Sequence, residues 1–360
     1  MLKILLGTAK GLVILEKHKK WKIAKVDFLG FPISFVYVDD RTNTWWVALA
    51  HRHWGPKLHR STDQGYTWES VDLPQYPVDT KLSNGQRATL KKMWCMQQAG
   101  KDYPNGLWLG TEPGGLFYSA DNGQHFELVR SLWDHPSRSD AMQWFGAGRN
   151  HPFIHSIVVD PTNNDHVYIA VSCAGIFETH DRGISWQPRN QGLIAAYLPN
   201  PKPEVGHDPH LLLQCASNTK VLWQQNHCGV FRTSNGGKLW ENISDTEGIA
   251  NYGFALAIDP QNAAKAWVIP ALSDEKRVAK DLALVISRTE DAGQTWQALR
   301  KGLPQQNCFD IVFRHAFQYY EGQLVFGTNN GNLYWSDNEG TNWQNIATNL
   351  ARIDTVQIVS

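Results

Sequence analysis

The stretch STDQGYTW (61–68) recurs along the chain in five near-copies. They read SADNGQHF (119–126), THDRGISW (179–186), TSNGGKLW (233–240), TEDAGQTW (289–296) and SDNEGTNW (336–343). Their first residues are 58, 60, 54, 56 and 47 positions apart, a spacing typical of radially repeated β-sheets rather than of a helical solenoid. This octapeptide motif therefore predicts an all-β protein built of repeated sheets.

Each position of the motif has a structural role. A short acceptor at the third position, such as Asp63, can accept hydrogen bonds from backbone N–H groups and hold a turn. The glycine at the fifth position, such as Gly65, suits a positive φ, and the closing aromatic, such as Trp68, buries a large apolar area. We therefore expect the motif to form turns that are fixed to a sheet, and its carboxylates to be scaffold rather than catalytic groups.

With these six copies the chain resembles the Asp-box, or BNR-repeat, proteins, which include sialidases, tandem-propeller xyloglucanases, sortilin-type receptors and photosystem assembly factors. The resemblance covers nearly the whole chain and implies a β-propeller. It does not imply one function, because hydrolases, receptors and assembly factors share the motif. Sialidases also carry an Arg-Ile-Pro motif, whereas Arg352-Ile353-Asp354 lacks the proline, which argues against a true sialidase.

The repeats predict how many blades the propeller has and how it closes. Each repeat supplies an inner strand, two strands that lead into the motif and one that follows it, and the last of these inner strands is expected at 309–317. The segment 4–21 has the same shape without the Asp and Gly and is a decayed seventh repeat that lacks an inner strand, while 352–360 is an unassigned apolar strand. We predict a single domain over 1–360, a seven-bladed β-propeller of four-stranded antiparallel blades, closed by the C-terminal strand pairing into the N-terminal blade.

Composition and charge narrow the range of partners. Lys+Arg and Asp+Glu balance at 34 each, so nothing favours nucleic acid or an anionic membrane surface, and no apolar run is long enough to span a bilayer. The N-terminal segment is predicted to form strands rather than a signal peptide. Five cysteines, an odd number, fit reduced thiols, and we expect a cytoplasmic protein.

Loop lengths indicate where a ligand would bind. In a meander of four strands, the motif turns lie at one end of the blade and the connections to the next blade lie at the other. The connections at 69–90, 127–150 and 187–208 are about twice as long as the three that follow. Long loops in a compact domain are commonly functional, so we predict the site on the face that these three loops share.

Histidine, arginine and carboxylate side chains gather on this face. As catalytic candidates we take Glu112 and Asp208, a carboxylate pair of the kind that glycoside hydrolysis requires, together with His151. The candidates for ligand binding are Arg87, Arg149, His207, His210, His227 and His53. Arginine suits the bidentate recognition of an anion, so this set predicts a small anionic or saccharide ligand.

Two alternatives remain open. A metal ion at His207, Asp208 and His210 is one, although the sequence has neither a Cys-x-x-Cys nor an HExxH motif, and we predict no cofactor. The main hypothesis is a glycosidase-like hydrolase or lyase. The other alternative to it is a non-catalytic scaffold or assembly factor that binds a protein partner on the same face. An enzyme should show a pocket with pKa-shifted groups, whereas a scaffold should expose aromatic side chains. The aromatic residues in question are Trp54, Trp133, Trp144 and Phe145.

Overall fold

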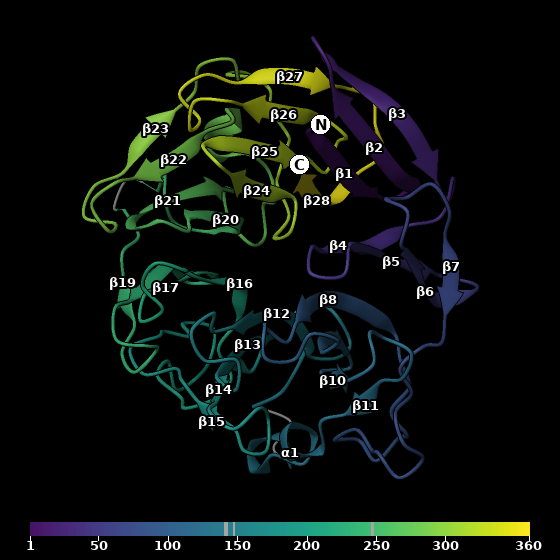
Figure 1. Cartoon of the computed structure of the whole chain (residues 1–360). Helices are drawn as coiled ribbons and strands as arrows, with labels where there is room; N and C mark the ends of the chain where they lie inside the picture. The colour runs from purple at the N-terminus through teal and green to yellow at the C-terminus, as the bar shows by residue number, and fades with distance from the viewer. Residues whose placement is uncertain (140–142, 147, 246–247) are drawn as a thin grey trace.

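The computed structural model describes residues 1–139, 143–146, 148–245 and 248–360. Seven four-stranded antiparallel sheets stand in a ring (Figure 1). Each sheet is one blade, and the innermost strands of neighbouring blades contact one another around the axis. The protein is therefore a seven-bladed β-propeller, as the repeat count predicts.

The blades are described here from the innermost strand outward. The first consists of β28 (Ile353–Val359), β1 (Lys3–Thr8), β2 (Gly11–Lys17) and β3 (Trp21–Asp27). The second and third consist of β4 (Ile33–Asp39), β5 (Thr44–His51), β6 (Gly55–Ser61) and β7 (Glu69–Val71), then β8 (Lys92–Gln98), β9 (Leu107–Glu112), β10 (Leu116–Ser119) and β11 (Glu127–Leu128). The fourth and fifth consist of β12 (Phe153–Val159), β13 (Val167–Ser172), β14 (Gly175–Thr179) and β15 (Gln187–Pro188), then β16 (Pro209–Gln214), β17 (Leu222–Asn226), β18 (Gly229–Thr233) and β19 (Glu241–Asn242). The sixth and seventh consist of β20 (Gly253–Asp259), β21 (Asn262–Pro270), β22 (Ile286–Thr289) and β23 (Gln297–Leu299), then β24 (Phe317–Tyr320), β25 (Gln323–Gly327), β26 (Leu333–Ser336) and β27 (Gln344–Ala347). The helices are short: α1 (Arg130–Trp133), η1 (Pro136–Ser139) and η2 (Lys280–Leu282).

The core lies between the blades. Every residue of β9 and of β13 is buried, because a second strand has a neighbouring blade on each face, whereas the short outer strand β7 is largely exposed. Fully buried tryptophans, among them Trp46, Trp108 and Trp223, fill these spaces. Most of the tryptophan in the sequence therefore serves packing.

The last strand of the chain closes the ring. β28 pairs antiparallel with β1, with Lys3 opposite Val359 and Leu6 opposite Val356. Its Ile353, Val356 and Ile358 side chains are buried. The decayed first repeat thus receives its inner strand from the C-terminal segment, as predicted.

The octapeptide motifs form the turns between the third and fourth strands. In the first copy, the Ser61 hydroxyl donates to Asp63 Oδ1 at 2.7 Å and accepts from the Gly65 amide at 2.8 Å, and the Thr67 amide donates to Asp63 Oδ1 at 2.9 Å. The other five copies repeat these three bonds. The hydrogen bonds from Ser61 and Thr67 lower the pKa of Asp63 to about 2. Gly123 shows why glycine is required, because its φ is +76° and a Cβ there would lie 2.4 Å from Trp46.

One predicted strand is wrong. The segment 309–317 is expected to be an inner strand, but β24 begins only at Phe317, the last residue of that range. The tight turn between Tyr320 and Gln323 fixes the register of β24 against the short β25, so the residues before Phe317 have no ladder partner there. The segment instead runs along the channel and makes one parallel bridge, from His315 to Thr355.

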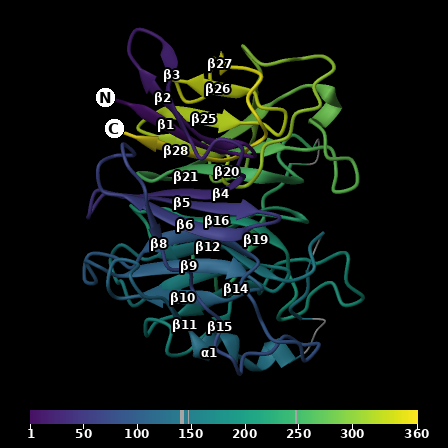
Figure 2. The ribbon, with the colours of Figure 1, turned by 90° about the vertical axis from the view of Figure 1, so that its right-hand side faces the viewer.

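The long connections lie at one end of the ring. Figure 2 shows them gathered on the right-hand side, while both chain termini lie on the left. They are the segments 72–91, 129–152, 189–208 and, because β24 starts late, also 300–316. The motif turns are at the opposite end, since each lies between the third and fourth strands of an antiparallel meander. The innermost strands therefore all begin at the end that carries the long connections, and we call this end the channel mouth.

Two further features bear on the predictions from composition. All five cysteines are free thiols. None of the helices in the described ranges has the length and apolar character needed to cross a membrane.

Candidate functional site

A repeated irregularity turns side chains into the channel mouth. Five innermost strands carry a register shift near their first residues, and each shift leaves one residue without a partner on the second strand. β28 has the same shift against β1. Such β-bulges re-aim a side chain relative to the regular alternation. The residues concerned are Ser34, Trp94, His155, His210, Phe254 and Asp354.

Five of these six residues line a cavity of about 270 Å³ at the channel mouth. The sixth, His155, is fully buried and its Nε2 bonds the Pro209 carbonyl oxygen. The wall of the cavity is aromatic: Trp94 and Phe153 stack with ring centroids 4.1 Å apart, and Phe254 stacks on His210 at 4.6 Å. The Arg314 guanidinium lies between these two stacks, 5.4 Å from the Trp94 ring and 5.9 Å from the Phe254 ring. The cavity thus combines flat apolar faces with a fixed cation.

Two cations of the mouth have no acidic partner. Lys92 Nζ lies 3.6 Å from the centroid of the Trp94 ring, and Arg314 Nε donates to the His210 carbonyl oxygen at 2.7 Å. Among the described residues no carboxylate forms an ion pair with Lys92 or Arg314. Burial lowers the pKa of Lys92 to about 8 and that of Arg314 to about 10. The charges of Asp354 and Glu112 offset part of this effect at Lys92, and the charge of Asp208 offsets part of it at Arg314. Both side chains are nevertheless desolvated cations without a direct ion pair, which is costly in a folded protein.

The other arginines around the mouth are neutralised. Arg149 Nε lies 2.6 Å from Glu112 Oε2, and the neighbouring pairs Arg277–Asp274 and Arg352–Asp354 have N–O distances of 2.5 and 3.0 Å. Glu112 also accepts a long hydrogen bond of 3.4 Å from Trp94 Nε1. Lys92 and Arg314 thus differ from the rest of the rim.

A buried carboxylate with two histidines forms the opposite side of the cavity. Asp208 accepts a 2.6 Å hydrogen bond from the Ser172 hydroxyl, and its other oxygen faces His210 Nε2 at 3.4 Å and His227 Nδ1 at 3.6 Å. Burial alone would raise the pKa of Asp208, but His210 and His227 hold it well below its usual range. Asp208 is therefore an ionised carboxylate throughout the physiological pH range.

The structure brings five of the nine predicted site residues together at the mouth. Arg149, Asp208, His210 and His227 line the cavity, and Glu112 is buried directly behind Arg149. They come from the third and fifth blades and from the connections 129–152 and 189–208, and they lie near one another because strand ends and connections on one face of a propeller surround the same channel.

Four predicted residues lie elsewhere. His207 is fully buried and its Nε2 bonds the Pro203 carbonyl, so it points away from the cavity because the side chains of consecutive residues in an extended segment alternate. His151 lines a separate hollow of about 680 Å³ that is formed mainly by the connections 72–91 and 129–152. Arg87 is exposed in the loop 72–91, and His53 is exposed in the β5–β6 turn, where its ring packs edge-on against Trp54. The alternative metal triad of His207, Asp208 and His210 is not assembled, because His207 is absent from the Asp208 cluster.

The charged and aromatic residues that line the larger hollow beside His151 contact one another and the backbone. Arg138 lies between Trp133 and Trp144, 4.0 and 4.4 Å from their ring centroids, and donates to the Gly114 carbonyl. Both tryptophans are buried. A protein-binding scaffold is expected to expose aromatic residues, and Trp54 is indeed 66% exposed, whereas Trp133 and Trp144 are each only 5% exposed.

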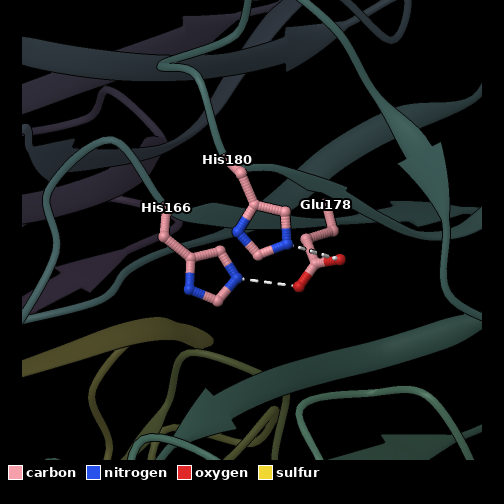
Figure 3. A group of neighbouring side chains, drawn as sticks. All are labelled: His166, Glu178 and His180. Atoms are coloured by element: carbon pink, nitrogen blue, oxygen red, sulfur yellow. Dashed lines mark hydrogen bonds and ion pairs between the residues drawn. The ribbon is translucent and has the colours of Figure 1, made fainter.

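A second histidine and carboxylate cluster lies at the end of the fourth blade opposite the mouth. It consists of His166, Glu178 and His180 (Figure 3), and Asp160 and Arg189 complete it. His166 Nε2 bonds Glu178 Oε1 at 2.8 Å and its Nδ1 bonds Asp160 at 3.1 Å. Burial would lower the pKa of His166, but these two carboxylates raise it. The contacts describe an ion-pair network rather than an open site.

Sequence analysis missed Lys92, Arg314 and the aromatic wall. The segments that carry Lys92, Trp94, Phe254 and Arg314 are expected to be inner strands, so the sequence gives these four residues no role in a site. One feature of the sequence could have indicated Lys92 and Arg314: each lies in a mostly apolar segment, and charged side chains are rarely buried without a partner.

No family model matches the chain, and no curated protein matches it in sequence. Solved structures do match it. A GH74 xyloglucanase from Xanthomonas campestris has a TM-score of 0.64 at 18% identity over 96% of this chain and 52% of its own. The periplasmic gluconolactonase PpgL from Pseudomonas aeruginosa has a TM-score of 0.61 at 12% identity over 100% and 99%, and YCF48 bound to D1 peptide has 0.54 at 15% identity over 96% and 85%.

The likeness is one of fold. Identities of this size do not transfer an activity. An ancestral GH74 enzyme matches at a TM-score of 0.59 and 17% identity, with 87% of this chain covered and 38% of its own. The chain thus spans about half or less of the two GH74 enzymes. By their names, the neighbours include two GH74 enzymes, a gluconolactonase and a protein with a bound peptide.

Proposed function

We propose that the channel mouth binds a small anionic, sugar-like ligand, and that the chain is an Asp-box propeller of the carbohydrate-related kind. The observation that carries this proposal is the pair of desolvated cations, Lys92 and Arg314, which have no carboxylate partner among the described residues. An anionic group of the ligand would supply the missing negative charge, in charge-assisted hydrogen bonds. Trp94 and Phe254 line the cavity, but each has a stacked ring on one face and they are only 8 and 6% exposed, so we expect charge rather than ring stacking to hold the ligand.

The contacts of the two candidate carboxylates, Glu112 and Asp208, argue against the acid-base hydrolysis that the sequence suggests. A glycoside hydrolase with two carboxylates needs one of them protonated, and the pKa of Asp208 is well below its usual range. Glu112 would then have to be the acid, yet it is ion-paired with Arg149. Ligand binding is therefore the primary proposal, and hydrolysis or elimination at the bound ligand is secondary to it.

Holding a protein partner is the second candidate function. It is favoured by an exposed apolar patch at the same end of the ring, formed by Leu29, Phe31 and Trp54, which are 78, 37 and 66% exposed. The patch lies on the first two blades, next to the mouth rather than in it. A partner bound there would not need Lys92 or Arg314.

Binding of matched sugars tests the primary function. We expect glucuronate to bind with an affinity at least about 10-fold higher than glucose, since a charge-assisted contact contributes roughly 1.5–3 kcal/mol. Isothermal titration calorimetry measures both affinities, and a rise of the melting temperature with glucuronate alone is the corresponding thermal readout. Equal binding of a series of sugar acids and their neutral counterparts, or binding of neither, would contradict the proposal.

Affinity for the anion should also depend on pH. Because burial lowers the pKa of Lys92 to about 8, its charge is complete below that pH and is lost as the pH rises through it. We expect glucuronate affinity to fall above pH 8, by up to about 10-fold per pH unit. The charged and titratable groups that face Lys92 are Asp354, Glu112, Arg149, Arg314 and His315.

A matched variant separates Lys92 from these neighbours. Lys92→Arg keeps a positive charge at every pH of the titration, so its affinity should stay flat above pH 8. The assignment fails if Lys92→Arg shows the same alkaline fall as the natural protein.

A further inference from the structure

We propose that Asp208, His210 and His227 bind a divalent transition-metal ion of the zinc type at the channel mouth. The three side chains come from the start of β16 and the turn after β17, and all three line the same cavity. One oxygen and two nitrogen atoms of these residues lie within 4.8 Å of one another. The two histidines and one carboxylate form a set that zinc accepts as three protein ligands with one open position.

The distances within this set are those of metal ligands rather than of hydrogen bonds. Asp208 Oδ2 lies 3.4 Å from His210 Nε2 and 3.6 Å from His227 Nδ1, which exceeds a normal N–H···O separation. Ligand atoms 2.0–2.2 Å from a tetrahedral zinc ion are separated from one another by roughly 3.3–3.6 Å. The two separations that involve Asp208 therefore match those around a zinc ion, and His210 Nε2 and His227 Nδ1 lie within 4.8 Å of each other.

Hydrogen bonds behind the ligands fix their orientation. His210 Nδ1 donates to the Gly253 carbonyl oxygen at 2.6 Å, which leaves Nε2 of the neutral ring as the lone-pair donor on the cavity side. The Ser172 hydroxyl holds the other oxygen of Asp208 at 2.6 Å. Metal-binding histidines and carboxylates characteristically have such outer partners.

The two histidine rings approach from different directions. The interplanar angle between His210 and His227 is 80°, and Tyr197 packs edge-on against His227 with centroids 5.0 Å apart. Lone pairs of two nearly perpendicular rings can converge on one point. The ion would then complete its coordination from the cavity, and the anionic group of the ligand is the natural fourth donor, a step that rests on the proposed function.

The cluster in Figure 3 lacks these properties. His166 and His180 are stacked 4.2 Å apart with an interplanar angle of 19°, and the Nε2 atoms of both rings pair with the Glu178 carboxylate. Arg189 already occupies one Glu178 oxygen. The second cluster therefore provides a control of similar composition within the same chain.

Metal titration tests the proposal directly. Protein stripped with a chelator is titrated with Zn²⁺ by calorimetry, and the visible spectrum of Co²⁺-loaded protein reports tetrahedral coordination. We expect the natural protein to bind one Zn²⁺ per chain. His227→Ala should lower the Zn²⁺ affinity by at least about 100-fold, because loss of a residue that only supports a ligand lowers metal affinity by about 10- to 100-fold. His227 is 24% exposed at its side chain, so this variant should keep its fold, and Asp208→Asn is a second variant of unchanged shape.

His180→Ala is the matched control and should bind Zn²⁺ within about 2-fold of the natural protein. The proposal is overturned if the stripped protein shows no saturable binding, or if His227→Ala binds as tightly as the natural protein. Glucuronate titration of the stripped protein separates the two proposals. Binding that depends on Lys92 without added metal supports the proposed function alone, whereas Zn²⁺ binding without glucuronate binding supports the metal site alone.

Discussion

A chain shortened to residue 352 will not form the closed ring, because it lacks β28. The deletion removes the buried side chains of Ile353, Val356 and Ile358, each of which contributes about 1.5–3 kcal/mol on burial. Their sum, roughly 5–9 kcal/mol, is comparable to the whole free energy of unfolding of a typical protein, about 5–15 kcal/mol. The deletion also leaves β1 as an open sheet edge, which favours aggregation.

Size-exclusion chromatography and thermal unfolding measure this effect. Deletion of Ser360 alone is the control, since β28 ends at Val359, and it should unfold like the natural protein. If the shortened chain cannot be purified, Val356→Asp places a charge at a buried position of the same strand and should lower the melting temperature strongly. A soluble monomer of residues 1–352 with an unchanged melting temperature would refute closure by β28.

Replacing Lys92 by methionine should make the protein more stable and at the same time unable to hold its anion. The pKa of Lys92 is lowered to about 8 by burial, so keeping this ammonium charged at pH 7 destabilises the fold by about 1–3 kcal/mol, after allowance for its partial exposure. Methionine has a similar length and no charge to desolvate. We expect the melting temperature to rise by a few degrees and the glucuronate affinity to fall by about 10-fold or more.

Lys238→Met is the control for this variant, because Lys238 is exposed at the opposite end of the ring. It should change neither quantity. A Lys92→Met protein that is less stable, or that binds glucuronate normally, would mean that Lys92 is a structural residue. A residue that serves ligand binding at the expense of stability should give a variant with a higher melting temperature and a weaker affinity.

The architecture could be predicted from sequence because its determinants are local and repeated. Each copy of the motif contains every group its turn needs, as the bonds between Ser61, Asp63 and Gly65 show. The closing strand followed from counting, since one inner strand was lacking and 352–360 was unassigned. The strand at 309–317 was predicted wrongly because its apolar residues are buried by the channel and by loops, not by a ladder partner.

The candidate site was predictable only in part, for a reason that lies in the strand register. Asp208 directly precedes β16 and His227 directly follows β17, and such strand boundaries can be located from the motif spacing. Trp94 and Phe254 lie at bulges, and a bulge inverts the alternation that sequence analysis relies on. Whether such a residue points into the core or into the channel depends on its pairing with the next strand, which only the structure gives.

The bulges have a consequence for how such proteins diversify. Each of six blades presents one side chain toward the axis from a position that has no partner in the ladder, among them Ser34, Trp94 and His210. A substitution at one of these positions alters what the mouth recognises while the strand pairing on either side stays the same. The ring therefore offers a set of positions around one axis through which new ligand preferences can evolve, or be engineered, on an unchanged scaffold, with the stacked pair His210 and Phe254 changing together.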